Sequence, residues 1–137
     1  AEVMEGLLER APKEIVGALP PGKMGGFGKS PKPLDLTRMP DPEKAAKATR
    51  YAKLIRHSRP FAVAAAFNAK LNEIVDETTN VLRTYSEDIL RELRAAPPEA
   101  RSNVESYWAL FLALCTLVLG EEETELLRRR ARVPASA

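Results

Sequence analysis

The sequence predicts an all-α protein, a helical bundle preceded by an extended, basic arm rich in proline and glycine. Apolar residues recur at steps of three and four over most of the chain, which is the spacing of an amphipathic helix. No stretch alternates apolar and polar residues as a half-buried strand does. Prolines and glycines gather between the periodic stretches, where they mark connections. We expect an N-terminal helix and arm over residues 1–41 and a helical bundle domain over residues 42–137.

The first apolar pattern covers residues 2–19 and is interrupted by Pro12. Proline can begin a helix but kinks one from within, so this pattern predicts either one short helix or two. Residues 20–40 follow, with five prolines and four glycines among twenty-one positions. A segment of this composition cannot bury a core of its own, and we expect it to form the extended arm.

Asp41, Pro42 and Glu43 form the start signal of a helix: an N-cap oxygen, a proline at the first position and an acid in the first turn. This helix should run to about Ser58. Pro60 then opens a longer helical pattern that reaches about residue 95 and is apolar on one face. We expect the following residues of that face to point to the core: Phe61, Ala64, Phe67, Leu71, Ile74, Val75, Thr78, Val81, Leu82, Tyr85, Ile89 and Leu93.

Two prolines, Pro97 and Pro98, separate the long helix from the next one, which covers about residues 99–119 and ends at Gly120. Residues 107–119 are all apolar except Thr116. Thirteen residues are too few to span a bilayer, so we expect a helix that is buried on all sides, by its own bundle or by neighbouring subunits. Contact with lipid at the surface of an assembly is the alternative. A last helix over about residues 121–132 starts with acids and ends with arginines, as its dipole favours.

The net charge of +2 hides an uneven distribution of charge. Residues 10–59 carry twelve basic and four acidic side chains, whereas acidic side chains outnumber basic ones by three in both 1–9 and 60–137. Such asymmetry predicts a polyanionic partner for the basic segment. Within it, a basic residue stands at every third position from Lys44 to Arg59. Because three residues fall about 60° short of a helical turn, these charges wind around the helix. Chance and solubility are the alternative explanation.

A helical wheel places Ala48, Tyr51 and Ile55 in a narrow apolar stripe, so this helix can pack on protein and still expose a diagonal band of charge. Contacts from such a band bind phosphates and do not read bases, which predicts sequence-independent binding of double-stranded DNA. The predicted nucleic-acid-binding residues are Lys23, Lys29, Lys32, Arg38, Lys44, Lys47, Arg50, Lys53, Arg56 and Arg59.

The residue patterns that carry catalysis are missing from the sequence. Residues 22–30 depart from a phosphate-binding loop, because Lys23 stands where that motif needs glycine and Pro31 follows where a helix should begin. His57 is the only histidine and Cys115 the only cysteine, which excludes a His-rich or Cys-based zinc site and an intrachain disulfide. We expect no enzyme activity, metal or cofactor, and we expect Cys115 to pack as a small hydrophobe.

Glutamine is absent and asparagine occurs four times, a shortage of thermolabile amides that is typical of thermophiles. With the basic arm, the all-helical pattern and the apolar C-terminal half, the chain resembles the major coat (capsid) proteins of filamentous viruses of hyperthermophilic archaea. It looks most like those of the enveloped Pyrobaculum filamentous viruses, the tristromaviruses. The resemblance concerns the architecture of the whole chain.

This resemblance implies a structural nucleocapsid protein that wraps double-stranded viral DNA in A-form and assembles into a helical filament. The protein would act as a homo-oligomer or as a heterodimer with a paralogous coat protein. It would place residues 44–59 on the DNA and residues 107–119 in subunit contacts or towards a lipid envelope. The expected location is the virion, after synthesis in the host cytoplasm, since the acidic first residues lack the features of a signal peptide. The acidic residues 2–9 depart from a simply basic arm.

Two other interpretations stay open from the residues alone. One is a cellular archaeal chromatin or nucleoid protein that coats duplex DNA without forming a virion. The other is a helical protein-protein interaction module whose basic helix binds an acidic protein. DNA affinity that falls steeply with ionic strength would separate this last interpretation from the first two.

Overall fold

The computed structural model describes residues 2–20 and 34–132. These residues form five α-helices and one short 3-10 helix, η1, and they contain no strand. In chain order the elements are α1 (Glu2–Ala18), α2 (Pro42–Ser58), η1 (Arg59–Phe61), α3 (Asn68–Ala95), α4 (Pro98–Val118) and α5 (Glu121–Arg132). The all-α class is confirmed. Most of the predicted arm, including Lys23, Lys29 and Lys32, lies outside the described residues, and the domain division at residue 41 stays a prediction.

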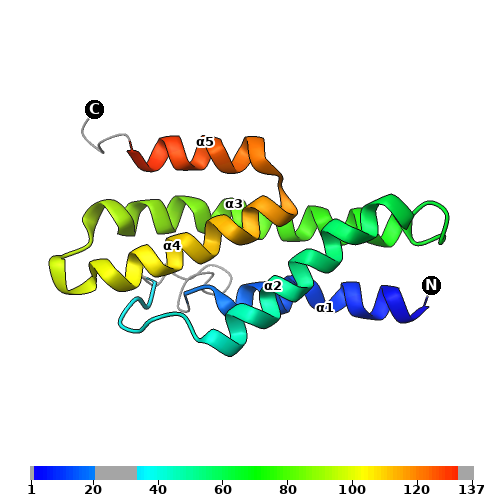
Figure 1. Cartoon of the computed structure of the whole chain (residues 1–137), viewed down its shortest axis with the longest axis horizontal. Coiled ribbons are helices and arrows are strands. Elements are labelled where there is room, and N and C mark those ends of the chain that lie inside the picture. The colour runs from blue at the N-terminus through cyan, green and yellow to red at the C-terminus, as the bar shows by residue number, and fades with distance from the viewer. Residues whose placement is uncertain (1, 21–33, 133–137) are drawn as a thin grey trace, which may run out of the picture.

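The helices lie in three layers (Figure 1). α5 runs along one edge, α3 and α4 form the middle, and α1 forms the opposite edge, while α2 crosses α1 diagonally and reaches the level of α3 at its C-terminal end. α2 packs on α1 and α4, whereas α5 packs on α4 and α3. This arrangement leaves the outer side of α2 and the outer side of α5 facing solvent on different sides of the molecule.

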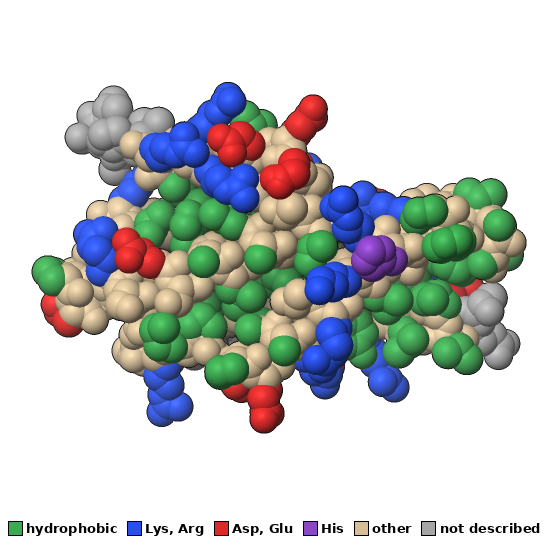
Figure 2. Space-filling view, in the orientation of Figure 1, with side chains coloured by type: hydrophobic (Ala, Val, Ile, Leu, Met, Phe, Trp, Pro, Cys, Tyr) green, Lys and Arg blue, Asp and Glu red, His purple; other side chains and the backbone are tan. Residues whose placement is uncertain are grey.

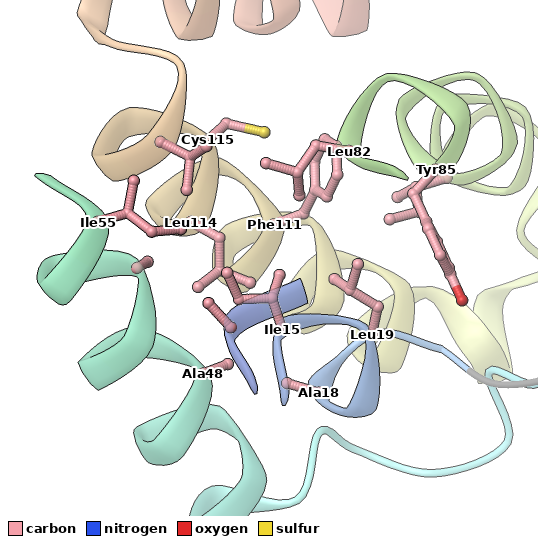
Figure 3. Close-up of a cluster of buried hydrophobic side chains, with 14 of the residues drawn as sticks. Ile15, Ala18, Leu19, Ala48, Ile55, Leu82, Tyr85, Phe111, Leu114 and Cys115 are labelled. Carbon is pink, nitrogen blue, oxygen red and sulfur yellow. The ribbon is translucent and has the colours of Figure 1, made fainter. Parts of the chain in front are cut away.

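The core lies where α1, α2, α3 and α4 meet (Figure 3). Ile15, Ile55, Leu82, Phe111 and Leu114 come from these four helices, and each is fully buried. Burying one side chain of this kind completely contributes about 1.5–3 kcal/mol. The core therefore joins the N-terminal helix to the bundle.

α2 begins and packs as its sequence predicts. The carboxylate of Asp41 accepts a hydrogen bond from the backbone N–H of Glu43 at 3.2 Å, which is the expected N-cap. Ala48 and Ile55 are fully buried and Tyr51 is half-buried, which confirms the apolar stripe. The small side chain of Ala48 lets a neighbouring helix approach α2 closely.

α1 is one helix, and Pro12 lies within it. Proline removes one backbone hydrogen bond from a helix interior. Leu8, Ala11 and Ile15 are fully buried on the same side of α1, and this packing against α2 and α3 keeps the helix continuous.

The connection between α1 and α2 is anchored at both ends. The Tyr85 hydroxyl donates a hydrogen bond to the carbonyl of Pro20 at 3.3 Å, and the Asn103 side-chain amide donates one to the carbonyl of Leu36 at 3.0 Å. Leu34 and Leu36 are buried. These contacts fix where the chain leaves α1 and where it enters α2.

The long helix α3 begins at Asn68 and not at Pro60, so the predicted start is wrong by eight residues. The chain reverses direction between α2 and α3 (Figure 1), and η1 with the following turns makes this reversal. Phe61 is 64% exposed and Ala64 is also exposed, so neither points to the core as expected. The apolar periodicity continues through a turn made of small and apolar residues, and periodicity alone does not show the reversal.

A Schellman motif completes this turn. The backbone N–H of Phe67 donates to the carbonyl of Ala62 at 3.0 Å, and that of Ala66 donates to the carbonyl of Val63 at 3.2 Å. Ala66 has φ +62°, in the left-handed region that favours glycine. The motif therefore holds a non-glycine residue in a strained conformation.

α4 ends as predicted at Gly120, whose φ is +101°, and its apolar stretch is buried along one side. Tyr107, Phe111, Leu114 and Val118 are buried, whereas other positions of the stretch are half-buried or exposed. Burial raises the pKa of the Cys115 thiol to about 12, so this cysteine packs as a small hydrophobe and stays protonated. In the part of the chain that the structure describes, no helix is long and apolar enough to span a bilayer.

α5 is joined to α3 by ion pairs as well as by packing. Arg83 donates to both carboxylate oxygens of Glu123 at 3.2 Å, and Arg130 donates to those of Glu87 at 2.8 and 3.0 Å. Leu127 of α5 is buried on the side that faces the bundle. The opposite side of α5 is left in solvent.

Candidate nucleic-acid interface

α2 displays basic side chains along the side that faces away from the core. The helix lies diagonally across the molecule in Figure 1, and its buried stripe points to α1 and α4. Figure 2 shows Lys and Arg side chains following this helix, with the single histidine among them. Four of the side chains are exposed on its outer side and are called here the α2 basic face: Arg50, Lys53, Arg56 and His57.

Arg50, Lys53 and His57 lie opposite the buried stripe, and Arg56 lies at its edge, about 100° around the helix from Ile55. At about 100° per residue, Lys53 is about 160° around the helix from the fully buried Ile55. Arg50 and Arg56 are about 9 Å apart along the axis, at about 1.5 Å per residue. Among the described residues, no carboxylate lies within ion-pair distance of Arg50, Lys53 or Arg56. The three cations are therefore available to an external anion.

Lys47 has a partner within the fold. Its ammonium lies 2.8 Å from a carboxylate oxygen of Glu14 on α1. The hydrogen bond from Lys47 lowers the pKa of Glu14 below its ordinary value, and the nearby charges of Lys47, Lys13 and Arg10 act in the same direction. Lys47 thus joins α1 to α2, although half of its side chain stays exposed.

Arg59 also has an internal partner. Its guanidinium donates a hydrogen bond of 2.6 Å to the backbone carbonyl of Val118, the last residue of α4. Carbonyls at a helix C-terminus lack partners in their own helix and carry partial negative charge, so a guanidinium stabilises them. The structure assigns Arg59 to this contact between the end of α2 and the end of α4, and its role in binding DNA stays a prediction.

Arg38 and Lys44 lie at the other end of α2, beside a cavity of about 460 Å³. The cavity is lined by Gly17, Ala18, Leu19, Asp35, Thr37, Arg38, Met39, Asp41, Lys44 and Tyr107. Asp35 accepts hydrogen bonds from the backbone and side chain of Thr37, which lower its pKa, and Asp41 caps α2. Burial raises the pKa of Tyr107, and Asp35 and Asp41 add to this effect. The mixed charges make this cavity a poorer site for phosphate than the α2 basic face.

The internal partners of Lys47 and Arg59 could not be predicted from the sequence. Glu14 is thirty-three positions from Lys47, and Val118 is fifty-nine from Arg59. Neither pair has a local spacing, because each contact depends on how separate helices pack. The exposure of Arg50, Lys53 and Arg56, by contrast, follows from the helical wheel.

No protein-family model, no curated protein and no solved structure matches this chain. Within residues 2–20 and 34–132, no three His, Cys, Asp or Glu side chains are grouped so that they could hold a metal ion. The function is therefore inferred from the geometry of α2.

Proposed function

We propose that this protein coats double-stranded DNA without sequence specificity, as a structural subunit of a helical nucleoprotein filament. One observation carries the proposal: α2 is docked by the fully buried Ala48, Ala52 and Ile55, and it presents three exposed cations with no acidic partner among the described residues. A helix held in this way places its charges on a rigid support, and backbone phosphates are the ligand that such charges bind.

The composition of α2 supports binding without base readout. The helix contains no asparagine or glutamine, and those side chains are the usual readers of adenine. Ala46 lies exposed on the outer side near Arg50, and so short a side chain lets the helix approach a DNA backbone closely. About 9 Å separates Arg50 and Arg56 along the axis of α2, which exceeds the rise of about 3.4 Å per base pair along a duplex, so the two cations can contact different phosphates.

The resemblance to coat proteins of archaeal filamentous viruses supports the finer parts of the proposal. These parts are DNA held in A-form, a virion as the location, a paralogous second subunit, and an envelope near the apolar residues 107–119. A cellular protein that coats duplex DNA would use the same face.

The salt dependence of DNA affinity tests the role of the α2 basic face. The triple variant Arg50→Gln, Lys53→Gln and Arg56→Gln should bind duplex DNA more weakly, with a flatter plot of log affinity against log salt concentration. The slope should fall by about 0.9 for each phosphate that the variant no longer neutralises, so by up to about 2.7. Two unrelated duplexes of equal length should show the same change.

A control variant removes the same charge from elsewhere on the molecule. Arg91, Arg94 and Arg101 are exposed on α3 and α4, and none of them belongs to the α2 basic face. Replacing all three with glutamine should leave the slope nearly unchanged. Equal losses of affinity in both triple variants would mean that net charge, and not the α2 basic face, governs binding. Unchanged affinity in the α2 variant would overturn the proposed site.

A further inference from the structure

Two exposed apolar features lie on opposite layers of the bundle. The first is a groove of about 300 Å³ between α1 and α2, called here the α1/α2 groove, and it is lined by Leu7, Lys47, Arg50, Tyr51 and Leu54. The second is on α5, where Leu126 is 56% exposed. We call this second feature the α5 outer face; it comprises Glu121, Glu122, Glu125, Leu126 and Arg129.

The two features are complementary in chemistry. The floor of the α1/α2 groove is apolar: Leu7 is 37% exposed, and Tyr51 and Leu54 are half-buried. Cations stand on its rim. The α5 outer face has the opposite charge: the exposed Leu126 lies beside carboxylates in the first turns of the helix.

The charges on the α5 outer face indicate that its acidic N-terminal part would contact the groove. Glu122 is exposed, and among the described residues no cation lies within ion-pair distance of it. Glu121 lies 3.6 Å from Arg128. Glu125 lies 3.3 Å from Arg128, 3.7 Å from Arg129 and 3.5 Å from Arg132, so both carboxylates are already paired within α5. Glu122 is therefore the carboxylate most available to Arg50.

The positions of the two features exclude a contact within one chain. α5 lies at one edge of the molecule and α1 at the other, with α3 and α4 between them (Figure 1). A second copy can bring its own α5 to the groove. Because the two surfaces differ, such a contact is heterologous, and each added copy leaves one free groove and one free α5 at the ends.

We propose that the α5 outer face of one copy docks into the α1/α2 groove of the next copy, with Leu126 inserted between Leu7 and Leu54 and Glu122 beside Arg50. The contact rests on the filament part of the proposed function and names the surfaces that would build the filament. Leu54 lies about 100° around α2 from Lys53 and about 160° from Arg56, so a docked α5 leaves these two cations open to DNA. Arg50 then pairs with Glu122 in the filament and binds phosphate only in a copy whose groove is free.

Mixing two defective full-length variants without DNA tests the contact. Wild-type protein should form a concentration-dependent series of oligomers in analytical ultracentrifugation. Leu126→Asp should disable the α5 outer face, and Leu7→Asp should disable the α1/α2 groove. Each variant alone should raise the dissociation constant of self-association at least about tenfold. Mixed together, they should form one-to-one dimers and nothing larger, because each mixed pair has one intact groove and one intact α5 outer face.

Two further variants control for folding and for nonspecific association through exposed apolar residues. Val63 is 77% exposed at the turn before α3, so Val63→Asp should leave assembly unchanged. Glu122→Lys touches no buried contact, and it should weaken assembly because it brings a positive charge to Arg50. All variants should keep the helical content and thermal unfolding of the wild type in circular dichroism.

Several results would overturn the contact. These are a wild type that stays monomeric at high concentration, a mixture that contains only monomers, a mixture that regrows long oligomers, and a Val63→Asp variant that no longer assembles. A wild type that stays monomeric but binds vesicles or another protein through the groove would replace the second copy with that partner. The affinity for a short DNA duplex distinguishes a failure of the proposed contact between copies from a failure of the proposed DNA binding. Leu126→Asp should bind a ten-base-pair duplex as the wild type does, whether or not copies associate.

Discussion

Six basic residues that recur with one spacing have different surroundings once the chain is folded. Lys47 pairs with Glu14, and Arg59 donates to the end of α4. Lys44 lies beside the cavity at the start of α2, and the other three cations are exposed on its outer side. Single residues of the series should therefore differ in what they contribute to stability and to binding.

Arg59→Gln should lower the free energy of unfolding by about 1 kcal/mol, because the carbonyl of Val118 loses a charge-assisted hydrogen bond. Lys53→Gln, which removes a charge with no partner among the described residues, should change it by less than about 0.5 kcal/mol. Denaturation with urea measures both. An Arg59→Gln variant with unchanged stability and a flatter salt dependence than Lys53→Gln would assign Arg59 to DNA and not to the fold.

At the scale of the elements, the sequence predicted α2, α4 and α5 well because each has local signals at its ends. Asp41 and Pro42 start α2, Pro97 and Pro98 delimit α4, and Gly120 separates α4 from α5. The predicted start of α3 was wrong because its preceding turn has no glycine at the left-handed position. Ala66 occupies that position, and its identity gives no turn signal.

Ala66→Gly should raise the free energy of unfolding by about 1 kcal/mol. Glycine adopts φ +62° without the steric cost that alanine has there, and this gain exceeds the entropy that glycine loses on folding. The neighbouring Ala65→Gly variant is the matched control, because no positive φ is found at Ala65. We expect it to be neutral or destabilising. Thermal unfolding of the two variants measures the difference, and equal effects would contradict a strained Ala66.

The α1–α2 ion pair should make stability depend on pH. Glu14 has a pKa lowered by Lys47, so its carboxylate favours the folded state above the pKa of the unfolded chain, ordinarily about 4.5. This contribution is lost as pH falls through the lower folded-state pKa. Wild type should therefore be more stable than Glu14→Gln at pH 7, and the gap should close between about pH 5 and pH 3. Urea denaturation across this range measures the gap; a gap that is constant with pH would contradict the pair.

At the scale of the whole molecule, the order of the layers could not be predicted from the sequence. Helical periodicity shows which side of each helix is apolar, but not which helix covers it. The placement of Glu14 beside Lys47, and of α5 opposite α1 and α2, depends on how the four helices share the core around Phe111. The outward direction of the basic face was predictable because it needs only the buried stripe of α2.

Site-directed cross-linking shows most directly whether DNA lies along the outer side of α2. Cys115 is fully buried and its pKa is raised to about 12, so an introduced surface cysteine can be labelled selectively near neutral pH. His57→Cys places a photoactivatable label within the α2 basic face and keeps every lysine and arginine. Ala95→Cys places the same label at an exposed position at the end of α3.

We predict that the label at residue 57 cross-links to two duplexes of unrelated sequence with similar yield. The label at residue 95 should give little product, and high salt should suppress the product at residue 57 as it weakens binding. Equal yields from the two positions, or bound DNA that never cross-links to residue 57, would contradict the placement of DNA on α2.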